Sequence, residues 1–182
     1  THLGGRDCPP SPDMSQGYTW ALYKDYDIFT ASLDDPTPVR LTESPGYDAE
    51  ATISPRGDRI VFTSARDGDL DLYTMKLDGS DVHRLTDAVG YDGGAFFSPD
   101  GSKIVWRASR FEDPAALKEY RDLLKEGFVR PSRMELYVAK ADGSGAKQIT
   151  SNGAANFCPF FTPDGKRIIF SSNMLDPRGR EF

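Results

Sequence analysis

Histidine and cysteine are scarce in this chain of 182 residues, which contains two of each. His2 and His83 lie far apart, and no group of His and Cys residues has the spacing of a metal site. The sequence also lacks the Gly-x-Ser-x-Gly turn of serine hydrolases and a glycine-rich phosphate-binding loop. These absences leave no motif for catalysis or for a cofactor, so we expect a protein that is not an enzyme and has no cofactor.

The chain has no hydrophobic run close to the roughly 18 residues that a membrane-spanning helix needs, so no direct membrane span is expected. Acidic residues outnumber basic residues by 28 to 22, which gives a net charge of −6. A nucleic-acid-binding surface requires clustered Lys and Arg side chains. This charge balance argues against a nucleic-acid partner.

The two cysteines leave two interpretations open. Cys8 and Cys158 could form a disulfide in an oxidising compartment, but one pair 150 residues apart is little evidence for it. Alternatively, Cys158 falls in a predicted strand, where an unpaired cysteine behaves as a small buried hydrophobic residue.

The main positive feature is an internal repeat. Several short motifs return at an offset of 44 residues, and most of them return again after a further 64 residues. The recurring motifs are Tyr-Asp at 47 and 91; Ser-Pro or Thr-Pro followed by x-Gly at 54, 98 and 162; an aliphatic pair and an aromatic residue at 60, 104 and 168; and Leu-Thr or Ile-Thr at 41, 85 and 149. A period of this length, made of short strand signals, is typical of β-propeller blades with four strands each.

One unit, residues 47–86, shows the expected blade. Pro and Gly at 55 and 57 favour a tight turn, and Asp78-Gly79 favours a hairpin turn. Around these turns the sequence predicts four antiparallel strands, at 48–53, 59–64, 70–75 and 82–86. Phe62, Trp106 and Phe170 occupy one repeat position, and we expect all three to be buried between neighbouring sheets.

The fold class that follows is all-β, a propeller with about three blade-equivalents in permuted form and one inserted α-helix. We expect a single partial propeller over residues 1–182 with the following parts: a Pro-rich arm (1–25), an outer half-blade (26–46), a full blade (47–90), a full blade with a helical insertion at 111–131 (91–153), and an inner half-blade (154–182). Propellers have about four to eight blades. We therefore expect further blades or a second copy to complete the ring; two such chains could complete six blades.

The insertion accounts for the longer second offset, because 20 extra residues separate the second and third strands of the third copy. Asp113 as N-cap, Pro114 at the first helical position and Gly127 as terminator predict a helix. Its apolar stripe, Leu117, Tyr120, Leu123 and Leu124, either docks on the propeller's own face or meets a partner. The insertion and the Pro-rich stretch at 7–23 should lie on the same side of the ring.

Acidic residues give two weaker candidate sites. Asp48, Glu50 and Asp92 begin inner strands, with Asn156 at the matching position of the last copy. These residues either cap nearby backbone N–H groups or form a polar rim at one mouth of the central channel, which would select a cation. Asp67, Asp69 and Asp71 resemble the opening of a calcium loop, but the later loop positions do not match. Because Asp71 recurs as Asp27 and Glu135, a structural role is favoured over metal binding.

A resemblance adds to this interpretation. The pattern Ser-Pro-Asp-Gly-x-x-Ile-Val-Trp at 98–106, followed by a Leu-Tyr strand, Asp-Gly-Ser at 142–144 and Ile149-Thr150, resembles the TolB-type, WD-repeat-like propeller family. The resemblance implies a six-bladed periplasmic propeller for protein–protein association, with a lipoprotein partner at one mouth of the channel. Similar blades also occur in prolyl-oligopeptidase-like peptidases and oligogalacturonate lyases, so the fold alone does not fix the function.

We therefore expect a non-catalytic scaffold or accessory subunit, outside the cytoplasm, whose partner is a protein such as a membrane-anchored or other envelope protein. The alternative is a propeller domain of a hydrolase or lyase whose catalytic residues lie elsewhere. The predicted partner surface comprises residues 113–127 and the Pro-rich stretch at 7–23, with Leu117, Lys118, Tyr120, Arg121 and Leu124 as its helical residues.

Overall fold

The computed structural model describes residues 17–131 and 133–177. In this part of the chain the strands are β1 (Trp20–Ala21), β2 (Phe29–Thr30), β3 (Val39–Arg40), β4 (Asp48–Ile53), β5 (Ile60–Ser64), β6 (Asp71–Met75), β7 (His83–Arg84), β8 (Asp92–Phe97), β9 (Lys103–Ser109), β10 (Phe128–Val129), β11 (Met134–Lys140), β12 (Lys147–Gln148), β13 (Asn156–Phe161) and β14 (Ile168–Ser172). The helix α1 spans Pro114–Lys125. The all-β prediction with one inserted helix is confirmed.

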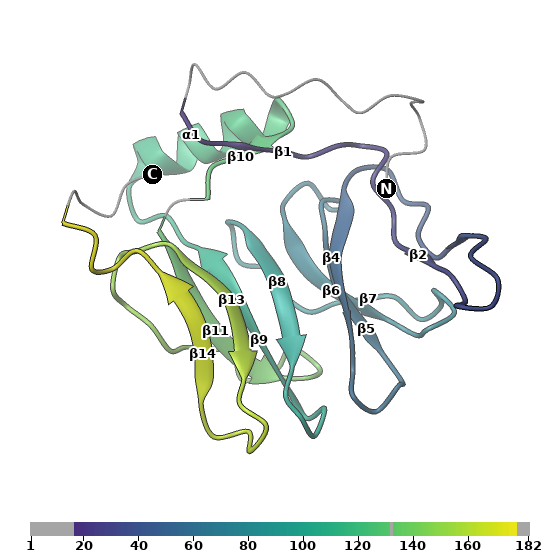
Figure 1. Cartoon of the computed structure of the whole chain (residues 1–182). Helices are drawn as coiled ribbons and strands as arrows, with labels where there is room; N and C mark the ends of the chain where they lie inside the picture. Colours follow the sequence, from purple (N-terminus) through teal and green to yellow (C-terminus); the bar gives the residue numbers. More distant parts are fainter. Residues whose placement is uncertain (1–16, 132, 178–182) are drawn as a thin grey trace.

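The strands form the predicted antiparallel blades. Two four-stranded sheets have the orders β4-β5-β6-β7 and β8-β9-β11-β12, and two two-stranded sheets are formed by β2-β3 and by β13-β14. Figure 1 shows these sheets side by side, as successive segments of a ring. The described residues thus contain two whole blades flanked by an outer half-blade and an inner half-blade.

The repeated Pro–Gly turns join the two inner strands of each blade with the same hydrogen bonds. The Gly57 N–H donates to the Ser54 carbonyl at 2.8 Å, and the Ser54 N–H donates to the Arg59 carbonyl at 2.8 Å. The same pair of bonds recurs in the turns at 98–103 and 162–167. The glycine in each turn has a φ of 66°. This backbone conformation costs little free energy for glycine, because it has no side chain.

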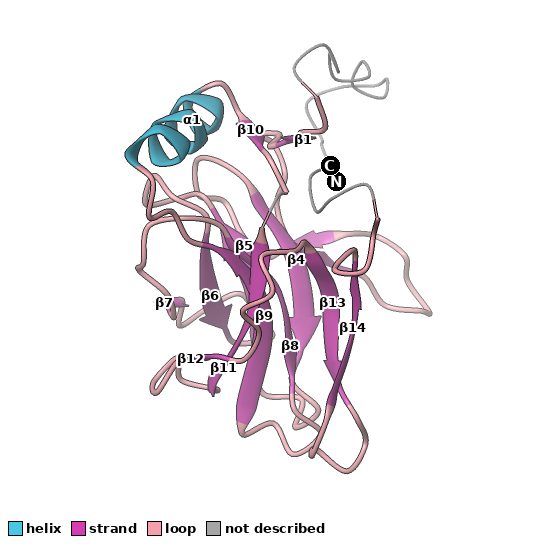
Figure 2. Cartoon of the chain, turned by 90° about the vertical axis from the view of Figure 1, so that its left-hand side faces the viewer, coloured by secondary structure: helices cyan, strands magenta, loops and turns pink. Residues whose placement is uncertain are grey.

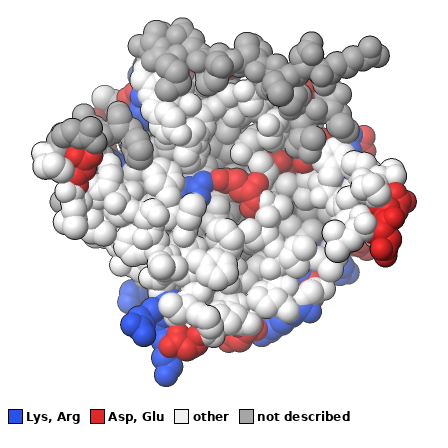
Figure 3. All heavy atoms as spheres, in the orientation of Figure 1, with Lys and Arg blue, Asp and Glu red and all other residues white. Residues whose placement is uncertain are grey.

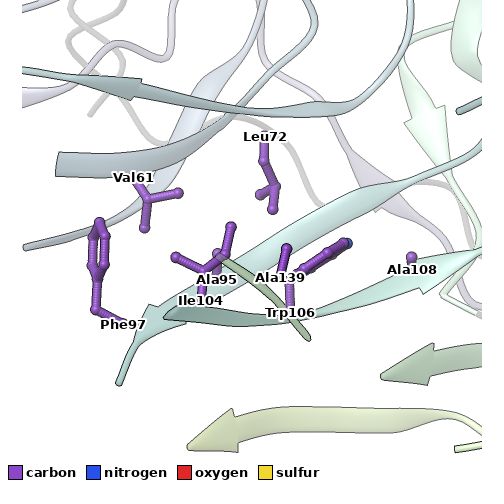
Figure 4. Packing of buried hydrophobic residues seen from close by; sticks show 8 residues of the cluster. All are labelled: Val61, Leu72, Ala95, Phe97, Ile104, Trp106, Ala108 and Ala139. Atoms are coloured by element: carbon purple, nitrogen blue, oxygen red, sulfur yellow. The ribbon is translucent and has the colours of Figure 1, made fainter. Parts of the chain in front are cut away.

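The core between the two whole blades is made of apolar side chains from both sheets, which Figure 4 shows facing one another. Phe62 and Trp106 are fully buried, as predicted. Phe170 is only partly buried. That part of the prediction is wrong. Among the described residues no third strand pairs with β14, so the outer edge of this two-stranded sheet is uncovered.

The helix α1 begins and ends where the sequence predicts. The Asp113 carboxylate accepts hydrogen bonds from the N–H groups of Ala115 and Ala116, at 3.1 and 3.3 Å. At the other end, Gly127 has a φ of 82° and its N–H donates to the Leu124 carbonyl at 3.1 Å. Such local caps satisfy helix-end groups that would otherwise lack partners.

A two-stranded sheet that the sequence did not predict joins the helix to the N-terminal part of the chain. The strands β1 and β10 pair with Trp20 opposite Val129, and the Leu22 N–H donates to the Gly127 carbonyl at 2.7 Å. Figures 1 and 2 show β1, β10 and α1 as a layer across one end of the blades. We call this layer the cap.

Candidate functional site at the capped end of the blades

Three of the four predicted mouth residues are buried and paired within the chain. Asp48, Asp92 and Asn156 each begin an inner strand and are at most 1% exposed. The Arg110 Nη2 donates to both oxygens of Asp92, at 2.7 and 2.9 Å, and the Arg66 Nη2 does the same to Asp48, at 3.2 and 3.1 Å. These residues link strands inside a blade and do not form an exposed acidic rim.

The last copy replaces both members of this ion pair. At the repeat positions of Asp92 and Arg110, it has Asn156 and Met174. The Asn156 amide donates to the Met134 carbonyl at 2.8 Å and to the Asn152 side-chain oxygen at 3.0 Å. A neutral amide needs no buried counter-charge, so the loss of the arginine accompanies the loss of the acid.

Burial raises the pKa of Asp92 to about 6, although Arg110 and the Trp106 indole oppose the shift. The Trp106 Nε1–H donates to Asp92 Oδ1 at 2.6 Å. A carboxylate whose two oxygens accept from an arginine, and one of them also from an indole, is well satisfied when ionised. The raised pKa therefore reflects the cost of removing the group from water.

Glu50 differs from the other three mouth residues. It lies at a bulge, where the register of β4 against β5 shifts between Ala49 and Thr52, and its φ is 56°. The same bulge position in the other copies is occupied by Gly94 and Cys158, also with positive φ. A side chain in the left-handed region costs about 1–2 kcal/mol, so surrounding contacts must stabilise Glu50 there.

The Thr63 hydroxyl of the same blade donates to Glu50 at 3.0 Å, and the other contacts of Glu50 come from the next blade. Its carboxylate pairs with the Arg107 guanidinium and accepts hydrogen bonds from the Tyr91 hydroxyl at 2.8 Å and the Gly94 N–H at 3.1 Å. A Cβ on Gly94 would lie 2.0 Å from Arg107 Nη1, so only glycine leaves room for the guanidinium. Burial and the nearby Glu50 raise the pKa of Tyr91 well above its ordinary value, which keeps the hydroxyl a donor.

Arg107 is a residue that sequence reasoning missed. Its guanidinium lies 5.4–5.7 Å from the ring centres of Trp20, Tyr91 and Phe157, and its Nε is buried without a hydrogen-bond partner. The repeat contained a signal for it, because the same position is Thr63 and Ser171 in the other copies. A large buried cation where the repeat has a small hydroxyl marks a departure from the blade scaffold.

A cavity of about 240 Å³ opens beside this ion pair, lined by Trp20, Leu22, Tyr47 and Val129 together with Glu50, Tyr91 and Arg107. Its walls therefore come from the cap and from two neighbouring blades. The face drawn in Figure 3 is largely uncharged, with one adjacent positive and negative pair near its centre. The site thus combines aromatic walls with an ion pair, Glu50–Arg107, whose two charges cancel.

The acidic residues 67, 69 and 71 do not converge on one point. Asp67 accepts from the Tyr73 hydroxyl at 2.5 Å, whereas Asp69 accepts from Tyr120 on the helix. Asp71 pairs with Arg84 at 2.6 Å. Across the described part of the chain, no group of His, Cys, Asp and Glu side chains is arranged to hold a metal ion.

Asp71 belongs to a repeated set of hydrogen bonds that links the third strand to a residue just after the fourth. The Thr86 hydroxyl donates to Asp71 at 3.1 Å and accepts from the Leu72 N–H at 2.9 Å. The equivalent threonines, Thr42 and Thr150, make the same two contacts in their own copies. The recurrence gives Asp71 a structural place in the blade.

The predicted partner residues of α1 divide into two groups. Tyr120 is buried against the blades, with Leu117 and Leu124 partly buried beside it. Lys118 and Arg121 are exposed. The apolar stripe thus docks on the propeller's own face, which leaves the charged side for solvent or a partner.

Cys158, at the bulge of β13, is exposed, so the interpretation as a buried residue is wrong. The bulge turns this position away from the core. Cys8 and most of the Pro-rich arm lie outside the described residues.

Comparison with solved structures shows the same fold. The chain is 23% identical to a protein described as TolB from Agrobacterium tumefaciens, with a TM-score of 0.65, and the match covers 86% of this chain and 55% of that one. TolB from Acinetobacter baumannii gives 22% identity and a TM-score of 0.61, covering 82% and 33%. A puromycin hydrolase gives 20% identity and a TM-score of 0.55, covering 84% and 23%. This chain therefore spans about half the length of the Agrobacterium protein and a third or less of the lengths of the other two.

No curated protein sequence matches this chain. Among the described residues, no helix is both long and apolar enough to cross a membrane. The profile of one family, described as the TolB beta propeller domain, matches residues 10–119. With this profile over more than half of the chain, and with the bladed sheets in the structure, the chain belongs to the TolB beta propeller family.

Proposed function

We propose that this chain is a non-catalytic propeller segment that binds a protein partner through its cap. The observation that carries the proposal is the cap itself, because β1, β10 and α1 add a layer that the blade repeat does not require. Blade 47–86 makes the same connection with a short loop. An added layer on a rigid scaffold is a common place for binding residues.

The polar groups of the blades support this assignment. The acidic residues that recur in the repeat are satisfied by arginines, threonines and backbone groups of the same blade. The chemistry that departs from the repeat, the Glu50–Arg107 pair and the exposed face of α1, is confined to the capped end. A binding surface for a partner is therefore best sought there.

The family suggests where the protein works and what it meets. We propose an extracytoplasmic location, in the periplasm, and an envelope or membrane-anchored protein as the partner. The half-blades at 26–46 and 154–182 are proposed to be completed by further blades or by a second copy, because an unpaired strand edge is a template for association.

Site-specific photo-cross-linking in the full-length protein tests the proposal. A photoreactive residue at Arg121, an exposed position on α1, should give a discrete cross-linked partner. The matched control places the same residue at Lys166, an exposed position in the turn at the opposite end of the blades. Equal cross-linking from both positions, or none from Arg121, would contradict a partner at the cap.

The second candidate function is a propeller domain of a hydrolase, and the observation in its favour is the similarity to the puromycin hydrolase fold. Labelling the native full-length protein with a fluorophosphonate probe separates the two. A labelled serine in the same polypeptide would favour the hydrolase. We expect no label.

A further inference from the structure

A groove lies between α1 and the neighbouring blade. It has a volume of about 460 Å³, and its apolar lining includes Leu22 next to the cap sheet, Tyr47 in front of β4 and Leu124 of the helix. Leu22 and Tyr47 also line the smaller cavity beside Glu50. The groove is large enough for a bulky apolar side chain with part of its flanking backbone.

The charges that line this groove are all positive. Lys24, Arg121 and Lys125 line it, and no acidic residue does so among the residues that the structure describes. This is unexpected in a chain with a net charge of −6. A local excess of one sign at a concave site attracts ligands of the opposite sign.

The cations of the groove have few ion-pair partners within the chain. Seven other arginines form ion pairs with carboxylates of the chain. Within the described ranges, neither Lys24 nor Arg121 takes part in an ion pair, and Lys125 has only a contact of 3.6 Å with Asp122. These groups keep their hydrogen-bonding capacity for a ligand.

We propose that the groove binds a segment of the partner protein in which carboxylates flank a large apolar side chain. The apolar side chain packs against Leu22, Tyr47 and Leu124, while Lys24, Arg121 and Lys125 receive the carboxylates. The inference rests on the proposed function and adds the chemistry of the partner. Charge complementarity would steer the encounter and fix the orientation of the segment.

A labelled peptide tests this. A blocked peptide with glutamates on both sides of a phenylalanine is titrated with the full-length protein, and binding is followed by fluorescence anisotropy. We expect saturable binding that weakens as salt rises, because surface charges are screened beyond a Debye length of about 8–10 Å near physiological ionic strength. Replacing the glutamates with lysines, or the phenylalanine with glycine, should each weaken binding by roughly tenfold or more.

The variant Lys24→Glu/Arg121→Glu should weaken binding of the acidic peptide by roughly tenfold or more. Lys147→Glu/Lys166→Glu is the matched control, since it reverses two charges at exposed positions that do not line the groove. We expect it to change the affinity less than about twofold, as exposed charges away from a contact do. Circular dichroism of each variant checks that α1 remains folded.

Several results would overturn the inference. They are equal binding of the acidic and basic peptides, binding that the double variant leaves unchanged, and no binding to the native protein. A dimer in sedimentation that the double variant dissociates would mean that a second copy occupies the groove. If cross-linking from Arg121 still captures a partner in any of these cases, the proposed function survives and only the acidic chemistry of the partner is rejected.

Discussion

Replacing Arg110 with methionine, the residue found at the equivalent position of the last copy, should destabilise the fold strongly at neutral pH. The change leaves the Asp92 carboxylate buried, and among the described residues the Trp106 indole remains as its side-chain hydrogen-bond donor. Breaking a buried ion pair by removing one partner costs about 3–5 kcal/mol. Lys147→Met, on the exposed edge strand β12, is the control and should cost less than about 0.5 kcal/mol.

The double variant Asp92→Asn/Arg110→Met introduces the pair of residues that the last copy has, Asn156 and Met174. An amide at position 92 carries no charge that needs a counter-ion, and its oxygen can still accept from Trp106. The double variant should therefore be more stable than Arg110→Met alone, with a coupling of about 1–3 kcal/mol in a double-mutant cycle. The two side chains act as one unit in this argument.

The destabilisation by Arg110→Met should also depend on pH. The pKa of Asp92 is already raised to about 6 by burial, above the ordinary value of 3.8. The folded state therefore binds the proton more tightly than the unfolded state, so this group adds stability below about pH 4 and loses it as pH rises to about 6. Without Arg110 the pKa rises further, so the cost of the variant should shrink as pH falls from 8 to 5.

Urea unfolding of the full-length protein, followed by tryptophan fluorescence at several pH values, measures these differences. The double variant should show a weaker pH dependence than Arg110→Met, because it lacks the titrating carboxyl. Additive effects of the two substitutions, or a cost for Arg110→Met that is the same at pH 5 and pH 8, would refute the reasoning from the buried pair.

Three further predictions concern other parts of the fold. Trp106→Ala should cost roughly 3–5 kcal/mol in urea unfolding, as large aromatic deletions in cores do; a cost below about 1 kcal/mol would mean that the blade register is wrong. Tyr120→Phe removes the hydroxyl that donates to Asp69 and should cost about 1–2 kcal/mol while α1 stays folded by circular dichroism; no measurable loss would show that the apolar contacts alone hold the helix. Glu50→Gly should be more stable than Glu50→Ala by about 1 kcal/mol, because both remove the carboxylate but only glycine suits a φ of 56°; equal stabilities would argue against the bulge.

Local patterns determined the elements of this protein. The strand β4 spans the predicted residues 48–53, and α1 begins at Pro114 after its Asp113 cap. These features depend on contacts between residues a few positions apart, so a single sequence contains their signals. The repeat shows most of these local signals two or three times, which made the order of strands within a blade predictable.

Short strands between distant segments could not be predicted. The strands β1 and β10 have two residues each and pair Trp20 with Val129 across more than 100 positions. No local pattern of two residues specifies such a partner. The pairing arises because the Gly127 turn and the docked helix bring the two segments together.

The chemistry of the capped end was likewise decided by the tertiary structure. From sequence, Asp48, Asp92 and Glu50 looked alike, as acids at the start of inner strands. The fold buries the first two against arginines of their own blades, and a bulge turns Glu50 toward Arg107 of the next blade. Sequence supplies the charges, but burial and the register of neighbouring sheets decide which of them are used inside the fold, because both depend on contacts between residues far apart in the chain.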